Sequence, residues 1–196
     1  EQYPQVQVNL VEATTSQLTD RLFSGSLDLL IDNKSMDPAI YQKSFFCEEH
    51  LLLAVPIRLS VNEKMKNYAL TASDIRENRH LNSRIPPVPL ENFQEESFLL
   101  LKSGNDTRTR ADRICHNAHV IPKIKLELDQ QITAYNLSRY GMGISFCSDT
   151  LVRHVPDDEG LVYYKLNHQD ALREVNFYYK RNRYMPRIVS TFLDMI

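Results

Sequence analysis

A run of short polar side chains is the part of the sequence best suited to hold a small anion. It consists of Thr14, Thr15, Ser16 and Gln17. Thr14 and Gln17 have the spacing of a capping box, in which a hydroxyl and an amide three residues apart begin a helix. The first turn of a helix carries backbone N–H groups without partners, and such groups bind carboxylates and phosphates. We therefore predict that these four residues contact an anionic ligand; the alternative is an ordinary helix cap.

Two further polar turns are candidates for contacts to the same ligand. In the first turn Gly104 lacks a Cβ, so the backbone can approach a bound molecule closely. Arg108 and Arg110 follow this turn, and either could pair with an acidic ligand or belong to a solvated helix face. For the turn residues, the alternative is a polar surface loop. The predicted contacts are Ser103, Gly104, Asn105 and Thr107 in the first turn and Gln130, with Gln131 beside it, in the second.

Metal binding and catalysis have little support in the sequence. Cys115 and His119 are four residues apart in a predicted helix, the spacing of two metal ligands on one face. A third ligand is not evident, so we favour a buried cysteine beside a surface histidine and predict no metal or other cofactor. The chain has neither a nucleophile-elbow motif nor a phosphate-binding glycine loop. We therefore predict no catalytic residue, although fold alone does not exclude an enzyme.

The first candidate site requires a strand and a helix to position it. Val6, Val8 and Leu10 alternate with polar residues, a pattern that predicts a strand over residues 5–10. The helix that begins near residue 14 is expected to end at Gly25 in the left-handed conformation. A second buried strand is expected over residues 27–31. Together these elements predict a strand–helix–strand unit with parallel strands and a right-handed crossover.

The rest of the chain continues to alternate strands and helices, which predicts an α/β fold. Residues 57–96 are less regular and contain prolines that interrupt regular structure. Short helices are expected within this segment, near residues 61–66 and 73–78. The remaining predicted strands are 41–46, 51–55, 98–101, 124–128, 144–147, 161–166 and 175–180, and the remaining helices are 107–117, 129–140 and a final one that begins at Pro186.

Composition excludes several classes of protein. The 196 residues carry a net charge of -2 and a pI near 6.3, which give no general attraction to nucleic acid or to an anionic membrane. The longest apolar runs are too short to span a bilayer. The N-terminus shows no charged-then-apolar leader, so export is not expected. Three scattered cysteines are typical of a reducing compartment, and we predict a cytoplasmic protein.

Several short motifs follow one another in a fixed order along nearly the whole chain. They are Tyr3-Pro4, the turn from Glu12 to Gln17, Leu22 through Gly25 to Leu27-Asp28, Glu49 through Leu53 to Pro56, Phe98 to Leu101, Gly104, Arg108, Asp112, Pro122 and Gly141-Met142-Gly143-Ile144. In this order and spacing they resemble the effector-binding domain of LysR-type transcriptional regulators.

The resemblance implies a fold of two Rossmann-like α/β lobes joined by crossover strands, as in type 2 periplasmic binding proteins. Lobe I would be residues 1–54 plus 165–196, and lobe II residues 55–164. A small anionic effector would bind in the cleft between the lobes. DNA would be bound by an N-terminal winged helix-turn-helix that is absent from this chain. The regulator would assemble as a homodimer or tetramer, with no membrane partner.

The sequence departs from the family pattern in two places. The span 67–87 is longer than expected, which affects the predicted shape of lobe II. Ser148 stands where the family usually has a proline. A second function with the same fold stays open at this point, a solute-binding protein of a transporter. That alternative requires export, and a signal peptide encoded upstream of Glu1 would favour it over a helix-turn-helix.

Overall fold

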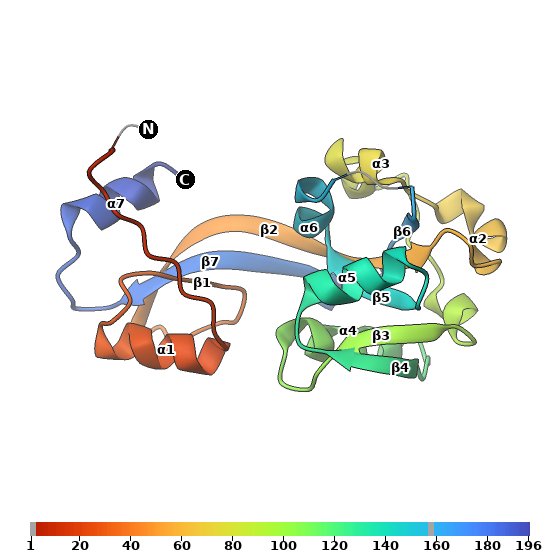
Figure 1. Ribbon diagram of the computed structural model, residues 1–196, viewed down its shortest axis with the longest axis horizontal. Helices are drawn as coiled ribbons and strands as arrows, with labels where there is room; N and C mark the ends of the chain where they lie inside the picture. Colours follow the sequence, from red (N-terminus) through yellow and green to blue (C-terminus); the bar gives the residue numbers. More distant parts are fainter. Residues whose placement is uncertain (1–2, 157–158) are drawn as a thin grey trace. The chain divides into compact units, whose positions relative to one another are not determined.

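The computed structural model describes residues 3–156 and 159–196. Over these residues the strands form a seven-stranded sheet. Six of them follow the order β1-β7-β2-β5-β3-β4, and the seventh, β6, lies off this path and pairs with β2. Helices alternate with the strands along the chain (Figure 1), which confirms the predicted α/β class. In this part of the chain no helix combines the length and the apolar character that a membrane crossing requires.

The chain divides into two compact units. Unit 1 consists of residues 1–47 with 174–196, and unit 2 consists of residues 48–173. Two long strands belong to both units, β2 (Tyr41–Pro56) and β7 (Leu172–Lys180). A strand that runs through two units is the crossover connection that the resemblance implies.

Strand β2 combines two strands that the sequence predicted separately, over residues 41–46 and 51–55. The predicted interruption around residue 48 is wrong, because Glu48 and its neighbours continue the extended backbone. The predicted lobe boundaries at 54/55 and 164/165 lie inside β2 and β6 (Leu161–Lys165), and the assignment of residues to lobes stays a prediction.

In unit 1, helix α1 (Thr15–Ser24) begins and ends as predicted. Thr14 is its N-cap, and the reciprocal bonds of the capping box with Gln17 are both present. Gly25 ends the helix with φ 85°, a left-handed conformation that glycine adopts without strain. The buried core of the unit contains Leu22 from α1 together with Leu30, Tyr41 and Tyr178. The final helix α7 (Arg187–Asp194) follows Pro186, also as predicted.

The strand predicted over residues 5–10 is not formed. These residues have no regular secondary structure, and the Leu10 side chain is 92% exposed. Strand β1 covers only Leu30–Asp32 and pairs antiparallel with β7. The prediction of a parallel strand–helix–strand unit over residues 5–31 is therefore wrong. Alternation produces an apolar face, but a strand also needs a neighbouring strand edge for its backbone groups. The three residues of β1 pair with β7 and not with residues 5–10.

Unit 2 contains the parallel part of the sheet. Strand β3 (Ser97–Leu101) pairs parallel with both β4 (Lys123–Leu128) and β5 (Ile144–Ser148). Each of these strands is followed by a helix: α4 (Asp106–Asn117), α5 (Gln131–Arg139) and α6 (Asp149–His154), respectively. Because the strands are parallel, all three helices begin at the same edge of the sheet.

The segment 67–87, which is longer than expected for the family, folds as an integral part of unit 2. It follows α2 (Val61–Lys64), begins within η1 (Lys66–Tyr68), and contains α3 (Ala72–Arg76) and η2 (Arg79–Leu81). Ile75 is fully buried and packs with Leu52 and Tyr163.

The chain then crosses to the other face of the sheet. Phe93, in η3 (Leu90–Phe93), packs with Leu53 and Tyr164, the neighbours of Leu52 and Tyr163. Successive strand residues point to opposite faces, so the segment from residue 67 to 93 covers both faces. It also lines the β6 edge, where the Val88 N–H donates to the Lys165 carbonyl at 2.9 Å. The segment thus closes an edge that would otherwise expose unpaired backbone groups.

Candidate functional site

The carboxyl ends of β3, β4 and β5 form one edge of unit 2. Leu101 at the end of β3 lies opposite Leu128 at the end of β4. The Lys102 N–H donates to the Leu128 carbonyl at 2.8 Å, which joins the two turns that follow. Helices α4 and α5 therefore present their N-terminal turns side by side. This edge is where open α/β sheets bind ligands.

The turn after β3 has room for a ligand. Gly104 has φ 92°, and a Cβ placed on it would meet no atom within 4 Å. Ser103 is exposed beside it. Asn105 is the N-cap of α4, with its side-chain oxygen accepting from the Thr107 N–H at 2.9 Å. The helix predicted over residues 107–117 begins one residue earlier, at Asp106, and its predicted end at Asn117 is confirmed.

Thr107 lies on the interior side of this turn. It is buried, and its hydroxyl accepts from Arg173 Nη1 at 3.0 Å. Arg173 is itself buried and also contacts Glu49 Oε2 at 2.9 Å and Asp106 Oδ2 at 3.2 Å. This network fixes the first turn of α4 to β2 and β7. A ligand contact from the Thr107 hydroxyl stays a prediction and would compete with Arg173.

The two arginines of α4 are engaged in structural contacts. Arg108 donates to the Leu101 carbonyl at 2.8 Å and pairs with Glu127. The contact with Glu127 outweighs desolvation and raises the Arg108 pKa. Arg110 pairs with Asp106 at 2.7 Å. Both guanidinium groups thus stabilise the wall of the edge, and pairing with an acidic ligand would require one of these contacts to break.

The second predicted turn lies at the start of α5. Gln130 is the N-cap residue of this helix and is exposed, without a side-chain capping bond. Gln131 is partly buried and accepts from the Ser148 hydroxyl at 3.3 Å. Ser148, at the end of β5, also caps α6 by accepting from the Leu151 N–H. Ser148 therefore lies at a helix start and joins α5 and α6 at the same edge.

The polar run in unit 1 lies at the N-terminus of α1, as predicted. The Thr14 hydroxyl accepts from the Gln17 N–H at 3.4 Å, and the Thr15 hydroxyl donates to Asp32 Oδ2 at 2.8 Å. Ser16 is exposed, and over the described residues its hydroxyl makes no hydrogen bond. Ser16 is therefore the side chain of this group that can contact a ligand at no structural cost. Thr14, Thr15 and Gln17 can contribute through the backbone of the first turn.

Comparison with known proteins identifies the family. A family model described as the LysR substrate binding domain matches residues 1–196. The chain belongs to this family. Among curated proteins, the chain is similar to the uncharacterized HTH-type transcriptional regulator YcgK of Bacillus subtilis (strain 168), with 24% identity over 98% of the chain and 58% of the relative. It is also similar to the hydrogen peroxide-inducible genes activator of Haemophilus influenzae, with 25% identity over 99% of the chain and 59% of the relative.

The chain thus spans less than two thirds of these relatives. Solved structures of LysR effector-binding domains share its fold. The Synechocystis PCC6803 CcmR regulatory domain in complex with 2-PG has a TM-score of 0.78 at 18% identity, covering 99% of this chain and 83% of that one. The BenM effector binding domain with its effector benzoate has a TM-score of 0.67 at 20% identity, covering 99% and 80%. These similarities confirm the type 2 periplasmic-binding-protein-like fold.

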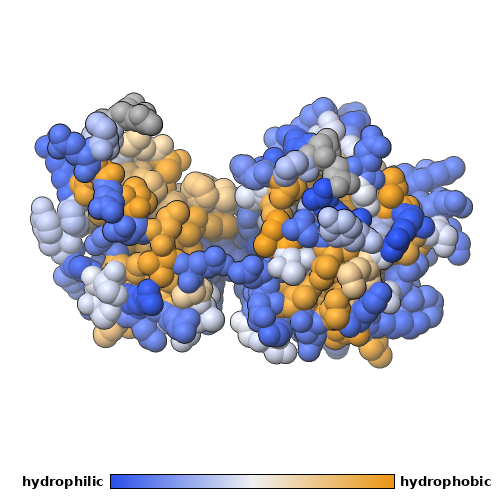
Figure 2. Space-filling model, viewed as in Figure 1, coloured by the Kyte–Doolittle hydropathy of each residue, from blue (hydrophilic) through white to orange (hydrophobic). Residues whose placement is uncertain are grey.

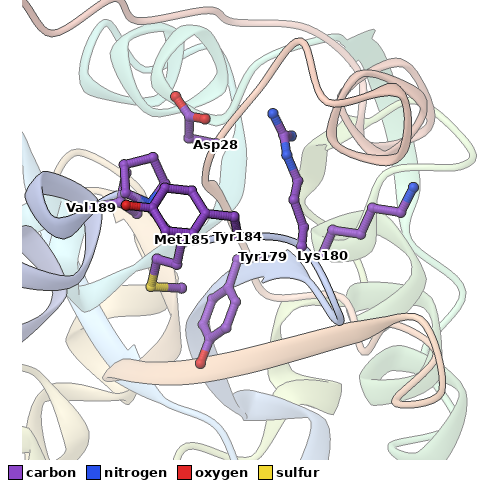
Figure 3. Close-up of a pocket in the computed structure, with 8 residues that line it drawn as sticks. Asp28, Tyr179, Lys180, Tyr184, Met185 and Val189 are labelled. Carbon is purple, nitrogen blue, oxygen red and sulfur yellow. The ribbon is translucent and has the colours of Figure 1, made fainter.

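A surface pocket in unit 1 lies apart from the predicted contacts. Figure 3 shows its lining beside the end of β7, and none of the nine predicted contact residues belongs to it. Two basic side chains of its rim have structural roles. Lys180 Nζ donates to the Phe23 carbonyl at 2.8 Å, and Arg183 Nη2 donates to the Gly25 carbonyl at 3.1 Å. These cations stabilise the C-terminal end of α1, where the helix dipole favours positive charge. The pocket is lined by Asp28, Tyr179, Lys180, Arg183, Tyr184, Met185, Pro186 and Val189.

The Cys115 and His119 pair does not have the geometry of a helical metal site. Helix α4 ends at Asn117, and His119 has φ 55°, outside the helix. The two residues are therefore not on one helical face. Burial, with a smaller contribution from Asp112, raises the pKa of the Cys115 thiol to about 12. A thiol in this environment stays protonated and is a poor metal ligand.

A buried acid–histidine cluster at the start of α6 was missed by the sequence interpretation. Asp149 is fully buried, and its Oδ2 lies 2.9 Å from His80 Nε2 and 2.8 Å from Arg153 Nη2. Its Oδ1 accepts from the His50 N–H at 2.9 Å. Burial alone would raise the Asp149 pKa, but the two histidines and the Arg153 charge outweigh it and hold the pKa well below its usual range. Spacing could not reveal this cluster, since its members are brought together only by the fold.

Proposed function

We propose that this chain is the effector-sensing domain of a LysR-type DNA-binding transcriptional regulator and that its effector is a small anionic metabolite. The match of the LysR substrate binding domain over the whole chain carries this proposal. Curated relatives named as HTH-type regulators support it. The anionic character is supported by neighbours solved with shikimate and with benzoate, which are carboxylates.

The proposed contacts are the N-terminus of α1 in unit 1 and the carboxyl edge of unit 2. Ser16 has an exposed hydroxyl over the first turn of α1, and Gly104 leaves open space at the second surface. The resemblance implies that one effector contacts both surfaces and changes the relative angle of the lobes. The full set of proposed contacts is Thr14, Thr15, Ser16, Gln17, Ser103, Gly104, Asn105, Thr107 and Gln130.

The whole regulator is proposed to act in the cytoplasm as a homodimer or tetramer that binds DNA through a segment outside this chain. Figure 2 shows apolar side chains gathered on the viewed face of unit 1. Exposed apolar residues of this unit include Phe23, Phe45 and Phe46. Apolar surfaces of this kind are typical of association sites. No catalytic role is proposed, and the transporter alternative has no support among the relatives.

Ser16 and Thr14 allow the sensor contact to be separated from helix capping. We expect Ser16→Ala to leave the free energy of unfolding nearly unchanged, because its hydroxyl makes no bond in the described structure. Thr14→Ala removes the cap and is expected to cost about 0.5–2 kcal/mol. Thermal unfolding of each variant measures the stability, and effector titration measures the response.

The effector itself can be found by thermal shift. A ligand present at about 100 times its dissociation constant stabilises the folded state by about 2.7 kcal/mol. We expect a hit among organic acids and phosphorylated acids, and a weakened hit in Ser16→Ala. A hit that binds Ser16→Ala and wild type equally would exclude the Ser16 hydroxyl as an effector contact. A broad library with no hit would contradict the sensor proposal.

A further inference from the structure

Three potential metal ligands from separate elements converge in unit 2. His50 lies in β2, His80 in η2, and Asp149 is the first residue of α6. Their side-chain ligand atoms all lie within 4.8 Å of one another. Asp149 and His80 are buried, whereas the His50 side chain is 32% exposed. Two imidazoles with one carboxylate form a ligand set that binds divalent transition metals.

Two of the separations between the ligand atoms are close to those around a small metal ion. Ligand atoms at about 2.0–2.1 Å from a tetrahedral zinc ion are about 3.3–3.4 Å apart. Asp149 Oδ2 lies 2.9 Å from His80 Nε2 and 3.5 Å from His50 Nδ1. These two separations bracket the tetrahedral value, and the ligand atoms of all three residues lie within 4.8 Å of one another.

An unsatisfied atom points to a ligand at this position. His50 Nδ1 is buried and has no hydrogen-bond partner among the described residues, although it faces the Asp149 carboxylate. Buried polar atoms are rarely left without a partner. The second oxygen of the carboxylate is already fixed, since Asp149 Oδ1 accepts from the backbone N–H groups of His50 and Thr150, both at 2.9 Å. Such outer bonds orient a metal-binding carboxylate.

We propose that His50 Nδ1, His80 Nε2 and Asp149 Oδ2 bind a divalent transition-metal ion of the Zn²⁺ class, with a fourth position open to water or a small anion. Arg153 is the competitor for this site. Its Nη2 lies 2.8 Å from the same Asp149 oxygen and neutralises the carboxylate when no ion is bound. The Arg153 side chain is 31% exposed and lies at the surface, so it can move into solvent when the ion binds.

Competition between Arg153 and the ion supplies the sharpest test. Calorimetry of the metal-depleted chain with Zn²⁺ measures affinity, and Co²⁺ absorption reports the coordination geometry. Arg153→Ala leaves the buried carboxylate without its cation and is expected to raise Zn²⁺ affinity about tenfold. If the cluster is a salt-bridge network and not a metal site, Arg153→Ala lowers the stability of the chain and gives no gain in Zn²⁺ affinity.

His50→Ala removes one proposed ligand at a partly exposed position. We expect it to weaken Zn²⁺ binding at least 10- to 100-fold, the loss that even outer-shell changes cause. His116→Ala, at an exposed histidine outside the cluster, is the matched control and should bind as wild type. Circular dichroism confirms that each variant is folded. The proposal is overturned if His50→Ala binds Zn²⁺ as tightly as wild type, if Arg153→Ala gives no gain, or if wild type shows no saturable binding.

Discussion

Arg173→Ala is expected to lower the free energy of unfolding by about 3–5 kcal/mol, because it leaves the buried Glu49 carboxylate without its cation. Arg173 contacts Glu49 at 2.8 Å through Nη2 and also reaches Asp106 and Thr107. The contacts connect β2, β7 and the first turn of α4. Urea denaturation of the full chain, followed by far-UV circular dichroism, measures the loss.

The matched control is Arg113→Ala. Arg113 pairs with Asp170 at 3.4 Å, and its side chain is 63% exposed. An exposed pair of this kind contributes about 0–1 kcal/mol. Equal losses in the two variants would contradict the structural role of Arg173. Because Arg173 and Glu49 are in direct contact, Glu49→Gln combined with Arg173→Ala should cost less than the sum of the single changes.

Ile75→Ala is expected to cost about 2–5 kcal/mol, the range for truncating a large buried aliphatic side chain. Ile75 is fully buried in the core cluster that contains Leu52 and Tyr163. It belongs to the segment 67–87, which the sequence comparison with the family pattern marked as longer than expected. A large loss would show that this segment stabilises unit 2, as its burial indicates.

Leu81→Ala is the control within the same segment. Its side chain is 48% exposed, so its truncation should change the free energy of unfolding by less than about 0.5 kcal/mol. If Ile75→Ala were as mild as Leu81→Ala, the segment would be a dispensable surface insertion. Urea denaturation under identical conditions distinguishes the two results.

The sequence predicted correctly those helices whose first and last residues are determined by local side-chain chemistry. The capping box of Thr14 and the left-handed Gly25 define α1 completely. Most strands and helices of unit 2 were predicted to within a few residues, because buried runs between polar turns determine them, but α6 was not predicted. The prediction of a strand at residues 5–10 was wrong, since alternation of apolar and polar residues cannot reveal whether a neighbouring strand is available for pairing.

The candidate site was predictable only in its local parts. The polar turn of α1 and Gly104 were found from residue type, and the structure places each at the start of a helix. The contacts that occupy Thr107 and Arg108 depend on Arg173 and Glu127, which are distant in sequence. The cluster at Asp149 is equally nonlocal, as His50 and His80 come from separate elements. Residue spacing in a single sequence carries no information on contacts between residues that are distant in the sequence.

The central claim is that one small anion contacts the N-terminus of α1 and the carboxyl edge of unit 2. Amide chemical-shift mapping of the isotopically labelled chain, titrated with a panel of carboxylic and phosphorylated acids, tests it most directly. We predict saturable shifts with a single dissociation constant at the amides of Ser16, Gly104 and Gln130. A saturating acid that shifts only amides remote from both surfaces, or a panel without any saturating acid, would contradict the claim.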